Sequence, residues 1–196
     1  MSTSLLQLIE TRLASYRPRK KLLRPLMKRS AVALILQLRD DELHILMIKR
    51  AEREGDTWSG HMAFPGGRKD PSDRNGFACA VRETEEEVGL QLGENDVCIG
   101  RLSEVNALSR VRGFGMAVTP YVFTLKREVT FCPNYEVAEV VWVPLSFLRE
   151  RANREIMKWK LKGMEIPLPA YYYEGRRIWG LSLNMLDELL KLIGND

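Results

Sequence analysis

Two apolar runs of strand length stand early in the chain and are separated by a short polar segment. Residues 31–38 (AVALILQL) and 43–50 (LHILMIKR) are dominated by aliphatic side chains, and the letters RDDE join them. This arrangement is typical of a β-hairpin. Because proline cannot donate a hydrogen bond to a sheet, Pro120 is expected to place its own strand at a sheet edge or at a bulge. Later apolar runs predict further strands at residues 97–105, 114–125 and 137–143.

Helical spacing of apolar side chains predicts four helices. Pro144 is expected at the first helical position of the third, and a glycine ends the fourth. Strands and helices mix without strict alternation, and no linker or internal repeat divides the chain. We therefore expect an α/β domain with a mixed sheet over residues 31–196, preceded by an N-terminal helix and arm over residues 1–30. The four predicted helices cover residues 4–16, 76–90, 144–152 and 181–194.

The bulk composition fits a globular protein with a core of its own. The chain has 196 residues, of which 45% are hydrophobic and 29% charged. Its longest purely apolar run, residues 31–36, is far shorter than the ~20 residues needed to span a bilayer. The first residues lack the pattern of a secretory signal, and the three scattered cysteines fit neither a disulfide framework nor a paired zinc site. We expect a cytoplasmic protein with reduced thiols and no membrane partner.

Positive charge is concentrated in residues 17–29 (RPRKKLLRPLMKR), which we call the basic arm. It holds seven basic residues and no acidic one, whereas the whole chain has a net charge of +4. Such a segment suits a phosphate-rich ligand or a nucleic acid. Its two prolines and interleaved leucines also suit a solvated connector that lies on the body of the protein. The connector is the favoured interpretation, and a nucleic-acid partner is not favoured.

Four glutamates crowd one short helical segment. Glu83, Glu86 and Glu87 have i, i+3, i+4 spacing and gather on one side, whereas Glu85 falls outside that arc. Arg82 lies one turn before Glu86 and can pair with it. Three carboxylates on one face repel unless cations join them, and hard oxygen ligands suit Mg²⁺ or Mn²⁺. The alternative is a solvated acidic face, which requires neither the arginine nor the glycines around the cluster.

The opposite side of the same helix is apolar. Phe77, Val81 and Val88 fall there and can pack on the sheet, with Thr84 at the margin of this face. The segment therefore predicts an amphipathic helix that turns its acids away from the core.

The letters RETEEEVGL resemble the second half of the Nudix box G-x5-E-x7-R-E-U-x-E-E-x-G-U, in which U is a bulky apolar residue. Thr84 stands where an apolar residue is usual. Fourteen residues separate Gly67 from Arg82 where the box has thirteen, so the early glutamate position falls on Asp73 or on Arg74. The positions that match are Gly67, Arg82, Glu83, Glu86, Glu87, Gly89 and Leu90.

This resemblance implies a Nudix-type α/β/α sandwich with a mixed β-sheet. It also implies a divalent-metal enzyme that hydrolyses a nucleoside diphosphate linked to another group. In this family the general base is either a glutamate of the box or an acid from another loop. Glu136 and Glu139 are the candidates outside the box, with a surface role as the alternative for either. The resemblance assigns metal binding to Glu83, Glu86, Glu87 and the carbonyl of Gly66, with Arg82 in the catalytic set.

Longer stretches are similar to the coenzyme A pyrophosphatase branch of the family. MIKRA, GHMAFPGG, EVAEVVWVPLSFL and YYYEGRRIWGLSLNML cover much of residues 46–190. This branch implies coenzyme A as substrate, with 3′,5′-ADP and 4′-phosphopantetheine as products. However, Ile48, Ala51 and Asp56 stand where its upstream signature has threonine, serine and arginine. ADP-ribose, NADH, dinucleoside polyphosphates and nucleoside triphosphates are the alternative substrates.

A third hypothesis is a nucleotide- or RNA-binding regulator on the same scaffold. Such a protein is expected to have lost Glu86 or Glu87, and both are present. An enzyme is therefore favoured.

Several residues are candidates for contact with a phosphorylated substrate. Arg50, Arg53 and Arg68 can meet phosphate oxygens with their guanidinium forks, although each also suits a surface position. His61 is a candidate substrate contact or a structural histidine. Trp179 can stack on adenine or lie in the core or a dimer interface. A homodimer is expected from the resemblance alone.

Overall fold

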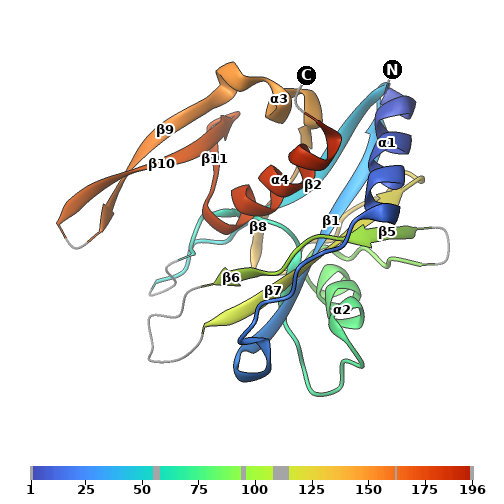
Figure 1. The fold of residues 1–196 in the computed structure, drawn as a ribbon, viewed down its shortest axis with the longest axis horizontal. Helices are drawn as coiled ribbons and strands as arrows, with labels where there is room; N and C mark the ends of the chain where they lie inside the picture. Colours follow the sequence, from blue (N-terminus) through green and yellow to red (C-terminus); the bar gives the residue numbers. More distant parts are fainter. Residues whose placement is uncertain (1, 55–57, 94–95, 108–114, 162, 195–196) are drawn as a thin grey trace.

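The computed structural model describes residues 2–54, 58–93, 96–107, 115–161 and 163–194, so Asp56 lies outside the described residues. Figure 1 shows a large mixed sheet with helices packed around it and a smaller sheet that extends to one side. The strands of the large sheet are β1 (Lys28–Arg39), β2 (Glu42–Arg50), β3 (Met62–Ala63), β4 (Gly66–Arg68), β5 (Val97–Arg101), β6 (Val105–Ala107), β7 (Met116–Leu125) and β8 (Val137–Pro144).

The predicted hairpin is confirmed by β1 and β2. The two strands are antiparallel, and the pair Arg39↔Glu42 closes the ladder. Asp40 and Asp41 form the two-residue turn with φ angles of 46° and 60°. Two successive positive φ angles are the signature of a type I′ turn, which matches the twist of the strands it joins.

The centre of the sheet is the parallel pair β1–β7, whereas the other pairings of this sheet are antiparallel. The strand order is β3-β2-β1-β7-β5, and β4, β6 and β8 pair with β1, β7 and β2. The fold is thus α/β with a mixed sheet, as predicted.

Pro120 does not lie at a sheet edge or a bulge, so that expectation is wrong. Its strand β7 runs between β1 and the two short strands β5 and β6. The single strand predicted at 97–105 is broken, and Leu102, in the break, donates its N–H to the carbonyl of Pro120 at 2.9 Å. Since the N–H and C=O of one strand residue point to the same side, the missing donor of Pro120 faces this break. The sheet accommodates the proline where its neighbour is interrupted.

Both faces of the sheet are buried, and β1 shows why. Val32, Leu34 and Leu36 belong to one core cluster, whereas Ala31 and Ile35 belong to the other. Alternate side chains of a strand point to opposite faces, so β1 supplies both cores. Figure 1 shows the helices that cover them: α1 (Ser2–Ser15) and α4 (Gly180–Ile193) lie against the first, and α2 (Gly76–Val88) lies against the second.

The predicted terminal helices are confirmed. Ile9 and Leu13 of α1 are buried in the same core as Leu186 of α4, and Gly194 is the C-cap of α4. No helix among the described residues is long and apolar enough to cross a bilayer.

The third helix is shorter than predicted. Helix α3 (Leu145–Arg149) has Pro144 as its N-cap instead of its first helical residue. Glu150 ends it and starts the 3-10 turn η2 (Arg151–Asn153), where its side chain accepts the N–H of Ala152. A competing cap inside the predicted segment therefore stopped the helix early.

The smaller sheet was not predicted from the sequence. It consists of β9 (Arg154–Leu161), β10 (Met164–Tyr173) and β11 (Arg176–Trp179), in the order β11-β10-β9. Proline argues against a strand, but Pro167 and Pro169 lie where β10 has β9 as its only paired neighbour. Their missing donors fall on the unpaired edge of that ribbon.

Candidate functional site

Helix α2 carries the glutamate cluster and packs on the sheet through a face centred on Thr84. Its N-cap Asn75 accepts the N–H of Ala78, and Gly89 ends it in the left-handed conformation with φ of 70°. Thr84 is fully buried, not marginal as expected, and its hydroxyl donates to the carbonyl of Ala80 at 2.7 Å. Phe77 packs on β7 as expected, with 5.9 and 5.7 Å between its ring centroid and those of Tyr121 and Phe123, although 41% of its surface stays exposed. Val88 is buried in the same core, so the predicted packing face is confirmed, with Thr84 at its centre.

The orientation of α2 brings two of the glutamates, Glu83 and Glu87, toward the turn formed by Gly66 and Gly67. The N–H of Gly66 donates to Oε2 of Glu87 at 2.8 Å. A Cβ at Gly66 would lie 2.3 Å from the carbonyl oxygen of Ala31, and one at Gly67 would lie 2.3 Å from a carboxylate oxygen of Glu83. Gly66 is required because its backbone lies against the backbone of β1, whereas a side chain at Gly67 would displace the Glu83 carboxylate.

The environment of Glu87 is unusual for a carboxylate. Its residue is 4% exposed, and burial raises its pKa to about 7. The nearby charges of Glu83 and Glu136 contribute to this rise in pKa, whereas the Gly66 N–H and the charge of Arg50 oppose it. Burial also raises the pKa of Glu83, against the opposing effect of Arg82. The two side chains thus hold a negative charge that the fold itself disfavours.

Glu86 lies apart from that pair. Its side chain is 54% exposed, and Oε2 accepts Nη1 of Arg82 at 2.8 Å, as the spacing predicted. Glu85 is exposed and accepts a hydrogen bond from Gln91, away from the other three glutamates. The acids of one helix therefore occupy three different environments.

Arg82 joins the helix to the preceding loop. Its Nε and Nη2 donate to the two carboxylate oxygens of Asp73 at 3.1 and 3.0 Å, and Nη2 also donates to Glu83 at 2.8 Å. The hydrogen bond from Arg82 lowers the pKa of Asp73, which is 7% exposed. Of the two alternatives at the early box position, Asp73 thus faces Arg82, and Arg74 is exposed.

The loop that carries Glu136 is tied to the end of the same helix. The N–H groups of Cys132 and Asn134 donate to the carbonyls of Val88 and Glu87, each at 2.9 Å. These are carbonyls of the last turn, which have no partner within a helix. The side chain of Asn134 accepts the N–H of Glu136 at 2.8 Å. Asn134 was not predicted, because CPNYE indicates only a turn.

Glu139 has different partners. Its carboxylate binds Lys49 at 2.8 Å and Arg176 at 2.7 Å, and the hydrogen bond from Lys49 is the main cause of its lowered pKa. Glu139 therefore joins β8, β2 and β11, whereas Glu136 is electrostatically coupled to Glu87.

The four predicted substrate contacts have different surroundings, and two of them, Arg50 and Arg53, lie near Glu87 and Glu136. The charge of Arg50 acts on Glu87, and Arg53 lies 3.6 Å from Glu136 with its guanidinium over the ring of Tyr135. Arg68 is exposed at the end of β4, and its carbonyl accepts Arg82. His61 packs edge-on against an aromatic neighbour, with 5.1 Å between the ring centroids.

That neighbour is Trp179, whose ring also packs against Trp159 with 4.4 Å between centroids, while Arg177 lies over it. The contacts on Trp179 fit the structural alternative for this residue.

The carboxylates of Glu83 and Glu87 suit a divalent cation, although they do not form a complete set of ligands by themselves. Within the described ranges, no group of three or more His, Cys, Asp or Glu side chains is close enough to hold an ion. Glu83 and Glu87 nevertheless face the same glycine turn with hard oxygen donors. A cation would offset both the burial and the repulsion that raise their pKa values.

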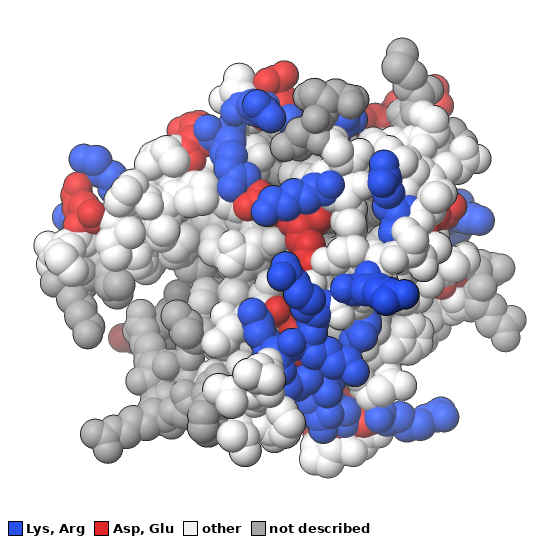
Figure 2. Space-filling model, viewed as in Figure 1, with Lys and Arg blue, Asp and Glu red and all other residues white. Residues whose placement is uncertain are grey.

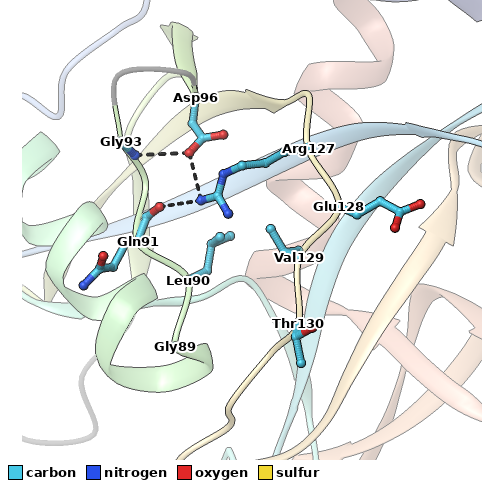
Figure 3. A pocket seen from close by; sticks show the side chains of 9 residues that line it. All are labelled: Gly89, Leu90, Gln91, Gly93, Asp96, Arg127, Glu128, Val129 and Thr130. Atoms are coloured by element: carbon cyan, nitrogen blue, oxygen red, sulfur yellow. Dashed lines mark hydrogen bonds and ion pairs between the residues drawn. The ribbon is translucent and has the colours of Figure 1, made fainter.

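A separate pocket lies beyond the C-terminal end of α2. Figure 3 shows that Asp96 accepts hydrogen bonds from the Gly93 N–H and from Arg127, which also donates to the carbonyl of Gln91. The pocket has a volume of about 490 Å³, and none of the box glutamates lines it. It is thus distinct from the acidic site.

Comparisons with known proteins show the family to which the chain belongs. Residues 27–160 match the NUDIX domain. A protein named uncharacterized Nudix hydrolase NudL from Photorhabdus laumondii subsp. laumondii is 30% identical over 149 residues, which is 76% of each chain. Another of that name from Yersinia pestis (strain Pestoides F) is 30% identical over 166 residues, covering 84% of this chain and 80% of its own.

Solved structures share the fold. A MutT/nudix family protein from Enterococcus faecalis has a TM-score of 0.54 at 17% identity, covering 93% of this chain and 65% of its own. An Ap4A hydrolase binary complex from C. elegans has a TM-score of 0.50 at 18% identity, covering 64% and 86%. The NUDIX match extends over more than half of the chain, and the two relatives align over most of their length. The chain therefore belongs to the Nudix family of pyrophosphohydrolases.

Proposed function

We propose that this enzyme hydrolyses the diphosphate linkage of coenzyme A, with release of 3′,5′-ADP and 4′-phosphopantetheine. The observation that carries the hydrolysis is the pair Glu83 and Glu87, which the fold holds at the Gly66–Gly67 turn in spite of burial and repulsion. The choice of coenzyme A rests on the similarity of residues 46–190 to that branch of the family.

Mg²⁺ or Mn²⁺ is the proposed cofactor. Glu83 and Glu87 would hold it, together with the Gly66 carbonyl and, after a change of rotamer, Glu86. When bound, the ion neutralises charge on the diphosphate oxygens that would otherwise repel a nucleophile. Glu86 can leave its pair with Arg82 at little cost because it is 54% exposed.

Glu136 is the proposed general base. It accepts a proton from the attacking water while the water oxygen bonds to one phosphorus and the P–O–P bridge breaks, leaving the second phosphate with the bridging oxygen. The coupling of Glu136 to Glu87 and the tie through Asn134 support this role. Glu139 is less suited as a base, since its carboxylate already forms ion pairs with the side chains of Lys49 and Arg176.

Arg50 and Arg53 are the proposed contacts for the negative charge of the substrate, because the charge of Arg50 acts on the proposed cation ligand Glu87 and Arg53 lies 3.6 Å from the proposed base Glu136. Arg68 and His61 are more peripheral candidates. The 3′-phosphate of coenzyme A adds negative charge that ADP-ribose and NADH lack, so Arg50 and Arg53 should favour coenzyme A over these two compounds.

The test is a panel of substrates at equal concentration, with and without Mg²⁺ and Mn²⁺. Coenzyme A, ADP-ribose, NADH, a dinucleoside polyphosphate and a nucleoside triphosphate are compared by kcat/KM. The highest value is expected for coenzyme A, and a higher value for another compound would reject the substrate but keep the reaction.

Glu87→Gln serves as the inactive control for this panel. If the wild type releases no more product than this control from any of the compounds, the enzymatic function is rejected and a nucleotide- or RNA-binding regulator is favoured. The homodimer and the cytoplasmic location stay predictions, and size-exclusion chromatography with light scattering tests the first.

A further inference from the structure

The basic arm (residues 17–29) is anchored to the body of the protein through Ser103 and Glu104. Glu104, whose side chain is 1% exposed, accepts the N–H of Lys21 and forms an ion pair with Arg24. Its own N–H donates to the carbonyl of Arg19 at 2.9 Å, and the Arg19 N–H donates to Ser103 at 3.0 Å. The arm lies on the body, as the favoured interpretation predicted, and these hydrogen bonds and the ion pair hold it there.

Most of its charge is not used by these contacts. Arg24 is the member of the arm that forms an ion pair with a described residue. Figure 2 shows basic side chains gathered below the centre of the visible face, where the arm crosses it in Figure 1, with few acidic ones among them. The six exposed basic residues are Arg17, Arg19, Lys20, Lys21, Lys28 and Arg29.

Three leucines project from the middle of the same segment. Leu22 is 94% exposed, Leu23 is 49% exposed and Leu26 is 63% exposed. Leu23 and Leu26 lie three residues apart at the 3-10 turn η1 (Arg24–Leu26), where side chains with this spacing stand on one side. The Leu26 N–H donates to the Leu23 carbonyl at 2.9 Å, which fixes the turn. Apolar side chains are thus presented outward by a backbone that is itself anchored.

We propose that the basic arm is a docking surface for an anionic lipid bilayer. Exposed leucines flanked by lysine and arginine match a bilayer in both parts, because the leucines enter the acyl boundary and the cations meet the lipid phosphates. No spanning segment is required for such a contact, so it agrees with the absence of one among the described helices.

Two other partners each explain only one of the two features of this surface, the exposed cations or the exposed leucines. A single-stranded RNA would use the positive charge, but it gives no reason to expose three leucines. A second copy of the chain would cover the leucines, but it would bring two sets of six exposed cations together about a twofold axis.

Vesicle co-sedimentation tests the proposal with the full chain. The probes are phosphatidylcholine vesicles with and without phosphatidylglycerol, at low and high salt, with single-stranded RNA as a competitor in one arm. Leu22→Ser combined with Leu23→Ser is expected to lower the partition coefficient on anionic vesicles about tenfold. Lys20→Gln combined with Lys21→Gln is expected to lower it by a similar factor.

The matched control is Ile156→Ser, since Ile156 is 69% exposed on β9, outside the arm. It should bind vesicles like the wild type. All variants should keep the hydrolytic rate, because residues 19–24 of the arm are anchored to Ser103 and Glu104 and not to the box glutamates. Loss of binding in the lysine variant alone would indicate a general polyanion surface and overturn the proposal. It would also be overturned by no vesicle binding, by an equal loss in the Ile156 control, or by RNA binding that depends on neither leucine.

Discussion

Replacing Glu87 by glutamine removes a charge that the fold buries while keeping the shape of the side chain. The amide oxygen of glutamine can still accept the Gly66 N–H that now binds Oε2 at 2.8 Å. The change is expected to stabilise the metal-free protein at alkaline pH and to abolish hydrolysis. A catalytic side chain would then be one that the fold holds at the expense of stability.

The sign follows from proton binding in the two states. Burial raises the pKa of Glu87 from 4.5 to about 7 in the folded protein. Between these pH values the folded state binds more protons than the unfolded state, so the free energy of unfolding falls as pH rises. The loss is complete above pH ~7 and absent below pH ~4.5.

The size of the effect is bounded by that shift. A displacement of about 2.5 pH units corresponds to about 3 kcal/mol. The buried amide group of glutamine costs about 1 kcal/mol if it finds no acceptor. A net gain of about 2 kcal/mol is therefore expected for Glu87→Gln at pH 8, and none at pH 5.

Urea unfolding in the presence of EDTA, at several pH values between 5 and 8, measures this difference. Adding Mg²⁺ or Mn²⁺ at pH 8 should then stabilise the wild type more than the variant, since the ion replaces the missing counter-charge. Glu85→Gln is the matched control, because Glu85 is exposed on the same helix and should show neither effect. A pH-independent difference between Glu87→Gln and the wild type, or a less stable variant at pH 8, would refute the reasoning.

Three further changes test how the site is built. Gly67→Ala places a Cβ 2.3 Å from the movable carboxylate of Glu83, so kcat should fall at least ~tenfold with little change in Tm; an unchanged kcat would contradict this geometry. Asn134→Ala removes the acceptor of the Glu136 N–H and should lower kcat about tenfold with a smaller change in KM. Steady-state kinetics measures both constants, and a kcat and KM equal to those of the wild type would show that Asn134 does not contribute to the site. Arg82→Lys cannot keep the forked hydrogen bonds of the guanidinium, so the free energy of unfolding should fall by about 1–3 kcal/mol, and a urea midpoint equal to that of the wild type would contradict the role.

Local patterns predicted those parts of the fold that depend on local physics. The β1–β2 hairpin follows from two apolar runs and an Asp-Asp turn, and the closing helix follows from its periodicity and Gly194. The ribbon of β9 and β10 could not be predicted in this way. Its prolines are tolerated because one edge of β10 is unpaired, and pairing is a property of the whole sheet.

The glutamates show the same difference between what local spacing predicts and what the tertiary fold decides. Their spacing predicted that Glu83, Glu86 and Glu87 share a side of the helix, yet one is buried, one is half-buried and one is exposed. What separates them is the Gly66 turn, which comes from a distant part of the chain and reaches Glu87 but not Glu86. Periodicity gives the direction of a side chain, whereas its burial and its pKa depend on what the tertiary fold brings opposite.

The extra residue in the box shows how the loop keeps a contact that its length would disturb. The backbone N–H of Asp70 donates to Oδ2 of Asp73 at 2.8 Å, and the Asp73 N–H donates back to the Asp70 carbonyl at 3.1 Å. Oδ1 of Asp70 accepts the N–H and the hydroxyl of Ser72, so the added length is taken up in a closed turn. Asp73 is thereby brought to Arg82, and Arg74 is left outside. The Asp73 carboxylate takes part in both the turn and the ion pair with Arg82. A substitution at Asp73 that keeps the charge but breaks the turn should therefore also lose the contact with Arg82.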